Sequence, residues 1–244
     1  MDKEQNFNTD YQSKYNIEEA FRLEQSQFTH QELLSMLLDG SISERQIAAL
    51  KFDKVCTKSD ILALISNLTG CDGKIREATA YKIHSLITNN SNIRSLFADT
   101  ASESFAKATI DINANICRYI VNSAALLKEY CQFTDSYTSL IINFTNEALD
   151  KLDKFIFRDK KYVINKQLFK LYWCLESLSN FVEYIDDNLL HSILLECATQ
   201  QEYTIREKCA QIIVTSNKFP DIKDLLINDE NYYVKQILTS SKHP

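Results

Sequence analysis

Glycine and proline are nearly absent from this chain, whose 244 residues include three Gly and two Pro. Average usage would give about 17 Gly and about 12 Pro in a chain of this length. Tight strand turns and phosphate-binding loops depend on glycine, because it adopts left-handed conformations freely and lets a ligand approach the backbone. The scarcity argues against a β-sandwich, a doubly wound nucleotide-binding fold and a Walker-type or dinucleotide-binding loop. It predicts an all-α protein.

Capping signatures divide the chain into short helices. Three residues with good N-cap side chains are each followed three positions later by Glu, the spacing of a capping box: Asn16, Thr29 and Ser41. Gly40 and Gly70 stand where runs of apolar residues spaced by three and four come to an end. Pro220 is suited to the first turn of a new helix. These marks predict helices of two to four turns with short polar joins.

A short motif recurs at the predicted helix starts. Its clearest copies are residues 74–83 and 204–213, and residues 43–50 begin in a similar way. With weaker copies included, the motif aligns at intervals of 31, 41, 47, 42 and 29 residues on Arg45, Arg76, Cys117, Ile164, Arg206 and Lys235. Because one amphipathic helix pair cannot bury its apolar face alone, the recurrence predicts stacked helix pairs.

The segments Asp72–Ala78 and Glu202–Glu207 resemble the HEAT/armadillo class of α-solenoids. The second helix of each pair in that class often opens with an acidic turn, an aliphatic–Arg pair and small residues. The resemblance covers about residues 30–240 and implies a right-handed α-α superhelix of about five irregular helical pairs. It also implies structural arginines that reach acidic groups of adjacent turns, namely Arg45, Arg76 and Arg206. The alternative is that these arginines are ordinary surface groups at helix starts.

We expect a single HEAT-like repeat domain over residues 16–240, preceded by a flexible arm over the polar residues 1–15. The seven Cys are scattered and never spaced as Cys-x-x-Cys, which is typical of buried thiols in a reducing compartment. No apolar run approaches the ~18 residues of a membrane-spanning helix, and the N-terminus is polar. The expected location is therefore cytoplasmic, with no membrane contact.

Motifs that carry catalysis or bind metal are missing from the sequence. It contains no Gly-x-Ser-x-Gly, no His-x-x-x-His and no calcium-binding loop. His84 and His191 stand among apolar residues and are expected to be structural, and Asp186 or Asp187 is expected to cap a helix. We expect no catalytic residue, no metal and no cofactor, so an enzyme is the less expected class.

A basic segment is the strongest candidate for function. Residues 151–170 carry a net charge of +5 in a chain of net charge −6, and residues 171–200 carry −5. Cations alternate there with aromatic residues, which gives the candidate partner-binding residues Lys151, Lys154, Arg158, Lys160, Lys161, Lys166, Lys170, Tyr172 and Trp173. Such a segment can contact an acidic protein surface, or grip a nucleic-acid backbone and stack on its bases. It can also be a solvated face over an aromatic core.

The sequence thus favours a non-catalytic protein–protein interaction module or scaffold that presents a solenoid groove to a protein partner. One alternative is nucleic-acid binding or DNA repair, as in the glycosylases built from HEAT-like repeats, through residues 151–173. That alternative requires a continuous basic face with an exposed Trp173. A third possibility is an accessory enzyme similar to the HEAT-like bilin lyases, whose groove holds a chromophore. The oligomeric state is left open.

Overall fold

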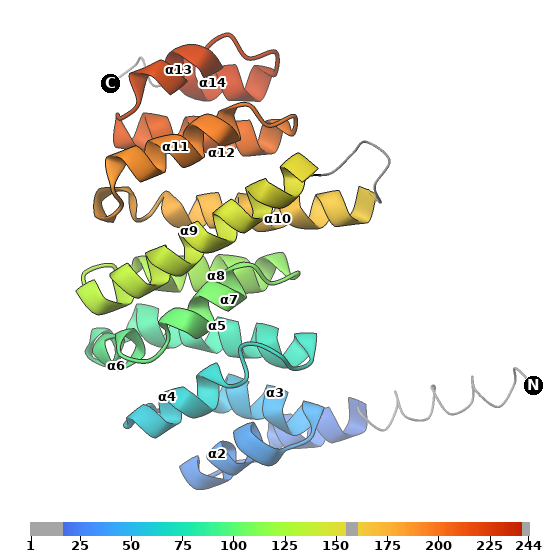
Figure 1. The fold of residues 1–244 in the computed structure, drawn as a ribbon. Helices are drawn as coiled ribbons and strands as arrows, with labels where there is room; N and C mark the ends of the chain where they lie inside the picture. Colours follow the sequence, from blue (N-terminus) through green and yellow to red (C-terminus); the bar gives the residue numbers. More distant parts are fainter. Residues whose placement is uncertain (1–16, 155–160, 241–244) are drawn as a thin grey trace, which may run out of the picture. The chain divides into compact units, whose positions relative to one another are not determined.

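The computed structural model describes residues 17–154 and 161–240. Within these ranges every regular element is helical, so the prediction of an all-α protein is confirmed (Figure 1). The chain forms two compact units, Met1–Ser104 and Phe105–Pro244. The single domain over residues 16–240 stays a prediction, and the predicted arm over residues 1–15 lies outside the described residues.

The first unit consists of helices in two layers. After a helical segment over residues 17–25 come α2 (His30–Asp39), α3 (Ile42–Lys51), α4 (Lys58–Ile65), α5 (Gly73–Asn89), the short η1 (Ser91–Ile93) and α6 (Arg94–Ala98). Helix α4 packs against α2 and α6 in one layer, and α3 packs against α5 in the other. The two layers pack against each other through the consecutive pairs α2/α3 and α4/α5.

The second unit repeats this arrangement. Helix α7 (Ser102–Thr109) contains the junction between the units, and it is followed by α8 (Ala114–Ala125), α9 (Cys131–Lys154), α10 (Lys161–Leu178), η2 (Val182–Tyr184), α11 (Asp187–Ala198), α12 (Tyr203–Ser216), α13 (Pro220–Leu226) and α14 (Tyr232–Ser240). Helices α9, α11 and α13 form one layer (Figure 1). Helices α8, α10, α12 and α14 form the other, which we call the even-numbered layer. The consecutive pairs α9/α10, α11/α12 and α13/α14 join the two layers.

The repeat motif found in the sequence marks one helix of each pair. Its six aligned residues are each the fourth residue of a helix, in α3, α5, α8, α10, α12 and α14 respectively: Arg45, Arg76, Cys117, Ile164, Arg206 and Lys235. The intervals are irregular because α9 has 24 residues and α13 has seven, and because η1, α6 and α7 all lie between the copies in α5 and α8. The motif therefore marks equivalent positions in successive helix pairs, although their spacing in the sequence is uneven.

Two of the three predicted capping boxes are present. Thr29 caps α2 and Ser41 caps α3, each with the reciprocal hydrogen bonds of a capping box, while Asn16 lies outside the described residues. A further box joins Thr57 to Asp60 at the start of α4. The sequence analysis considered Glu at this position, but the shorter Asp60 side chain also accepts from the backbone N–H of Thr57.

Gly40 ends a helix and Pro220 begins one as predicted, whereas α4 ends at Ile65 and Gly70 lies in the turn that follows it. Gly40 follows α2, where a Cβ would lie 2.5 Å from the carbonyl oxygen of Met36. Gly70 has a φ of +74°, in the left-handed region that favours glycine. Pro220 is the first residue of α13. These positions are fixed by local backbone geometry, so the sequence could indicate them directly.

A buried tyrosine ties the layers of the second unit together. The hydroxyl of Tyr137 on α9 lies 2.8 Å from the hydroxyl of Thr109 and 2.8 Å from that of Ser177 on α10. Its ring stacks on Phe133 at 5.3 Å between centroids and lies 5.4 Å from that of Phe181. Burial raises the pKa of Tyr137, so the neutral phenol holds this arrangement. The contact fixes α10, which carries the candidate site.

Candidate partner-binding site

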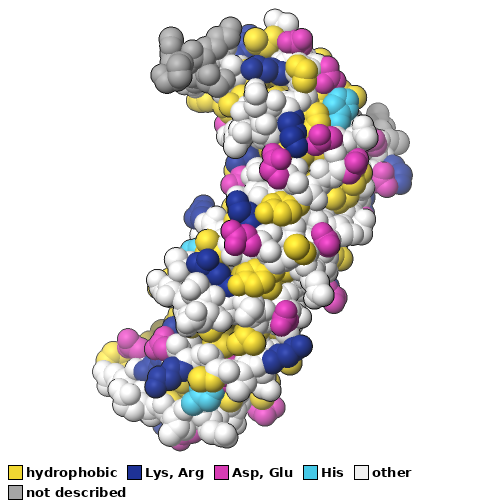
Figure 2. All heavy atoms as spheres, turned by 90° about the vertical axis from the view of Figure 1, so that its left-hand side faces the viewer, with side chains coloured by type: hydrophobic (Ala, Val, Ile, Leu, Met, Phe, Trp, Pro, Cys, Tyr) yellow, Lys and Arg dark blue, Asp and Glu magenta, His cyan; other side chains and the backbone are white. Residues whose placement is uncertain are grey.

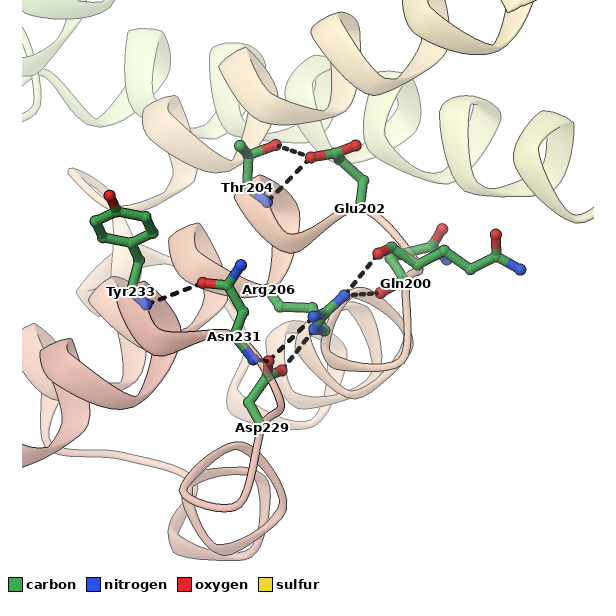
Figure 3. Close-up of polar contacts among 8 residues, drawn as sticks. Gln200, Glu202, Thr204, Arg206, Asp229, Asn231 and Tyr233 are labelled. Carbon is green, nitrogen blue, oxygen red and sulfur yellow. Dashed lines mark hydrogen bonds and ion pairs between the residues drawn. The ribbon is translucent and has the colours of Figure 1, made fainter.

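The repeat arginine of α12 joins two turns of the second unit (Figure 3). Arg206 Nη1 donates to the carbonyl oxygens of Gln200 at 2.7 Å and Gln201 at 2.8 Å, just before α12. Its Nε and Nη2 donate to the two carboxylate oxygens of Asp229, at 2.6 Å and 3.0 Å, in the turn after α13. The guanidinium lowers the pKa of Asp229, whose side chain is 6% exposed. Arg206 therefore links its own turn to an acidic group of the next.

The other repeat arginines also contact turns. Arg45 Nε donates to the side-chain oxygen of Asn67 at 2.8 Å, in the turn after α4. Arg76 Nη1 donates to the carbonyl oxygen of Cys71, in the turn before α5. Arg45 thus reaches an amide where Arg206 reaches a carboxylate. These contacts tie helix pairs to their loops and leave the candidate site to other residues.

The structure disperses the basic segment. Arg158 and Lys160 lie outside the described residues. Four lysines are exposed around the end of α9 and the first half of α10: Lys151, Lys154, Lys161 and Lys166. Figure 2 looks from the left-hand side of Figure 1, away from the end of α9 and the start of α10 that carry these lysines, and there Lys and Arg side chains are interspersed with Asp and Glu. These lysines lie exposed at one end of the α9/α10 pair, and their role in binding a partner stays a prediction.

Lys170 is engaged inside the second unit. Its Nζ lies 3.0 Å from Glu147 Oε2 on α9 and 4.7 Å from the ring centroid of Phe144. The hydrogen bond from Lys170 lowers the pKa of Glu147. The Lys170 side chain is 15% exposed, so its charge is used to hold α10 against α9.

Tyr172 and Trp173 belong to a pocket between α8 and α10, here called the α8–α10 pocket. It encloses about 330 Å³ and is lined by Arg118, Val121, Asn122, Tyr172, Trp173 and Glu176. Trp173 is 7% exposed and packs on Cys117 and Val121. The indole Nε1 of Trp173 is buried without a hydrogen-bond partner in the described structure. The pocket is thus lined by two aromatic residues, and the buried indole N–H of one of them has no acceptor, which is rare in folded proteins.

A lysine from α12 neutralises the only carboxylate among the lining residues. Lys208 forms an ion pair with Glu176 and donates to Gln211 Oε1 at 2.8 Å. Its Nζ lies 4.9 Å from the ring centroid of Tyr172. Burial acts to lower the pKa of Lys208, but the contacts with Glu176 and Tyr172 outweigh it and raise the pKa. Lys208 therefore stays charged and keeps Glu176 occupied.

Arg118 and Asn122 supply polar groups that the protein itself does not use. They lie one turn apart on α8, both are exposed, and both line the α8–α10 pocket. Neither side chain makes a hydrogen bond or ion pair with any of the described residues. The candidate list from the sequence missed both of them. Their i, i+4 spacing places both on one face of α8, but it does not indicate that they lack partners.

Most groups that could carry chemistry elsewhere are buried or structural, although the thiols of Cys56 and Cys131 are exposed. All seven cysteines are free thiols, and burial raises the pKa of Cys117, Cys174 and Cys209 to about 12, which suppresses the reactive thiolate. Across residues 17–154 and 161–240, no group of three or more His, Cys, Asp or Glu side chains is placed to hold a metal ion. None of the helices in this part of the chain is both long and apolar enough to cross a membrane.

The histidines and the Asp pair have structural contacts. Asp186 caps α11 by accepting from the backbone N–H of Leu189 at 3.0 Å, so the predicted cap is confirmed. His191 Nε2 lies 2.7 Å from Asp221 Oδ2 on α13. His84 is half-buried in α5, and burial lowers its pKa. Asp186 thus caps its own helix, and His191 joins α11 to α13.

Comparison with solved structures finds helical-repeat proteins. The complex of CpcE and CpcF of phycocyanin lyase from Nostoc sp. PCC7120 is 13% identical with a TM-score of 0.48, over 88% of this chain and 76% of that one. An archaeal HEAT-like repeats protein from Thermococcus onnurineus NA1 is 10% identical with a TM-score of 0.46, over 88% and 80%. A designed armadillo repeat protein is 13% identical with a TM-score of 0.44, over 87% and 98%. No protein-family model and no curated protein matches the sequence.

The likeness concerns the fold alone. The chain is similar to HEAT-like and armadillo repeat structures, in line with the resemblance of its repeat motif. Its own helix pairs and the fourth-residue register of the motif are the direct evidence for the repeat.

Proposed function

We propose that this protein is a non-catalytic interaction module that binds a segment of a partner protein on the even-numbered layer of its second unit. The observation that carries the proposal is the α8–α10 pocket. Next to Tyr172 and Trp173 there, the side chains of Arg118 and Asn122 make no hydrogen bond or ion pair with the described residues. Trp, Tyr and Arg supply a large share of the binding energy at protein interfaces. Stacked helices present such groups on a rigid surface.

The chemistry of the pocket favours binding over catalysis. Its carboxylate, Glu176, is held by Lys208 and cannot act as a free general base. The nearby thiol of Cys117 is buried with a raised pKa, so it is a poor nucleophile. The remaining groups can hold a ligand by hydrogen bonds, charge and aromatic contact.

Nucleic-acid binding through residues 151–173 stays a prediction. The buried position of Trp173 and the pairing of Lys170 with Glu147 do not favour it, because stacking needs an accessible ring and phosphate contact needs unpaired cations. A fluorescence anisotropy titration with a labelled single-stranded oligonucleotide tests it. Binding that weakens with added salt and on charge reversal at Lys154 and Lys161 would support this alternative.

We also infer that the protein acts in the cytosol. The seven free cysteines support this inference, because thiols persist in a reducing compartment. Fluorescence microscopy of the tagged protein in its native host tests the location.

Cross-linked affinity purification from the native host tests the interaction. We expect a partner protein with the wild-type chain and at least about a tenfold loss of that partner with Asn122→Trp, which fills the exposed side of the pocket. Asn146→Trp on α9 is the matched control, because Asn146 is exposed and lies outside the pocket. Equal recovery of every partner by wild type and Asn122→Trp would refute the proposed surface.

A further inference from the structure

We propose that the α8–α10 pocket binds a carboxylate group of an acidic segment of the partner protein, with Arg118 as the anchor. This inference rests on the proposed function and adds the chemistry of the partner. Its basis is the set of charges around the pocket, which leaves one cation without a counterpart.

Arg118 is the unpaired cation. Its guanidinium is exposed on α8 and makes no hydrogen bond or ion pair with the described part of the chain. A planar guanidinium binds a carboxylate through two parallel N–H···O bonds, which gives direction as well as attraction. Asn122 lies one turn further along the same face of α8, so its amide can donate to a ligand held by Arg118.

The neighbouring carboxylate does not fill this role. Glu176 lines the same pocket and would compete for Arg118 if it were free, but it is paired with Lys208. Lys208 is 13% exposed, and its position over the Tyr172 ring and its bond to Gln211 hold it there. Arg118, Lys208 and Glu176 together therefore leave one positive charge at the pocket. Lys208 is a positioning residue for the site, because it keeps Glu176 away from Arg118.

The wall of the pocket suits the stem of an acidic side chain. The rings of Tyr172 and of the largely buried Trp173 line the pocket and give it an aromatic side. The volume of about 330 Å³ lies at the lower end of the ~300–1,000 Å³ of ligand pockets. That size fits one side chain of a longer segment rather than a large cofactor.

A protein segment fits the charges better than a nucleic acid does. A nucleic-acid strand carries a phosphate at every nucleotide and needs a row of unpaired cations. Along this part of α10 and α12, Lys170 and Lys208 are each paired with a glutamate. One free cation beside aromatic rings matches a single carboxylate in an acidic, partly apolar segment.

The single tryptophan makes the test specific. Trp173 is the only Trp in the chain, so its indole fluorescence and its indole 1H–15N resonance report on this pocket alone. The full chain is titrated with a capped Ala–Leu–Glu peptide and with the same peptide carrying Gln in place of Glu. We expect saturable changes of both signals with the Glu peptide, which weaken with added salt. We expect no saturable change with the Gln peptide.

Variants locate the binding group. Arg118→Gln should weaken binding of the Glu peptide by about tenfold or more. Arg118→Lys should weaken it less, because the positive charge stays while the two parallel N–H donors of the guanidinium are lost. Arg22→Gln, which removes an exposed arginine of the first unit, should leave the affinity unchanged. Lys208→Met should also weaken binding, because it frees Glu176 to occupy Arg118. Arg118 is exposed, so its variants are expected to fold.

Other outcomes overturn the inference. Equal binding of the Glu and Gln peptides, or no effect of Arg118→Gln, would show that no carboxylate is anchored there. Tighter binding of a single-stranded oligonucleotide at the indole would assign the pocket to nucleic acid. If the inference fails in either way while Asn122→Trp still abolishes partner capture, the proposed surface stands without its acidic ligand. If the Glu peptide binds through Arg118 while Asn122→Trp captures the partner normally, the carboxylate site stands and the proposed function fails.

Discussion

Removal of Arg206 should destabilise the second unit strongly. Its guanidinium makes two hydrogen bonds to carbonyl oxygens before α12 and two to Asp229 after α13 (Figure 3). The Arg206 and Asp229 side chains are 16% and 6% exposed. Substitution by Met keeps the apolar stem and removes all four bonds at once.

The expected magnitude follows from what is left behind. Breaking a buried ion pair by removing one partner costs about 3–5 kcal/mol, because the other charge stays unpaired. Here the value is reduced, since Arg206 is partly exposed and Asp229 still accepts from the backbone N–H of Asn231 at 2.7 Å. The two freed carbonyl groups lie near the surface and can bind water. We expect Arg206→Met to lower the free energy of unfolding by about 2–4 kcal/mol.

Urea unfolding followed by circular dichroism measures this loss, and Arg22→Gln serves as the control. The lowered pKa of Asp229 adds a pH signature. The Asp229 contribution is present above the unfolded pKa of about 3.9 and is lost as pH falls through the lower folded pKa. The difference in the free energy of unfolding between wild type and Arg206→Met should therefore become smaller below about pH 4. A loss under about 0.5 kcal/mol at neutral pH would refute this reasoning.

Three further predictions concern the two units. Tyr137→Phe leaves two buried hydroxyls without their shared partner, so urea unfolding should show a loss of about 1–2 kcal/mol; an unchanged midpoint would contradict the role of the phenol. Gly70→Ala should lower the melting temperature because Gly70 has a positive φ, with a cost of about 1 kcal/mol, whereas Gly73→Ala in open space at the start of α5 should not; equal effects would contradict the backbone explanation. Burial acts to raise the pKa of Asp60, but backbone N–H groups and His30 outweigh it and lower the pKa. Asp60 therefore stabilises the first unit above about pH 4, and this contribution is lost as pH falls through the lowered pKa. In Asp60→Asn, the free energy of unfolding from urea titrations should fall less steeply with decreasing pH than in wild type, and equal slopes would contradict the role of the carboxylate.

Local rules predicted much of the fold from the sequence. The capping boxes at Thr29 and Ser41, the helix end at Gly40 and the first-turn Pro220 depend on backbone groups within a few residues, so each could be found without knowing any distant contact. The repeat register could also be found, because the fourth residue of each marked helix occupies an equivalent place in its pair.

The candidate site could be predicted only in part. Tyr172 and Trp173 were found from their place in a cationic–aromatic segment, yet the structure pairs them with α8 rather than with the exposed lysines. Arg118 was missed because nothing near it in the sequence shows that its charge lacks a partner. Pairing depends on side chains 50 or more residues away, such as those of α10 and α12.

The sequence by itself determined that this protein is helical, where many of its helices begin and end, and that its helix pairs repeat. These properties follow from backbone hydrogen bonding and from the period of apolar residues, both of which act over one or two turns. Only the tertiary structure decided which charged side chains form ion pairs within the fold and which are left for a partner. Lys170 and Lys208 found glutamates across a helix interface, and Arg118 did not, because packing decides which faces meet.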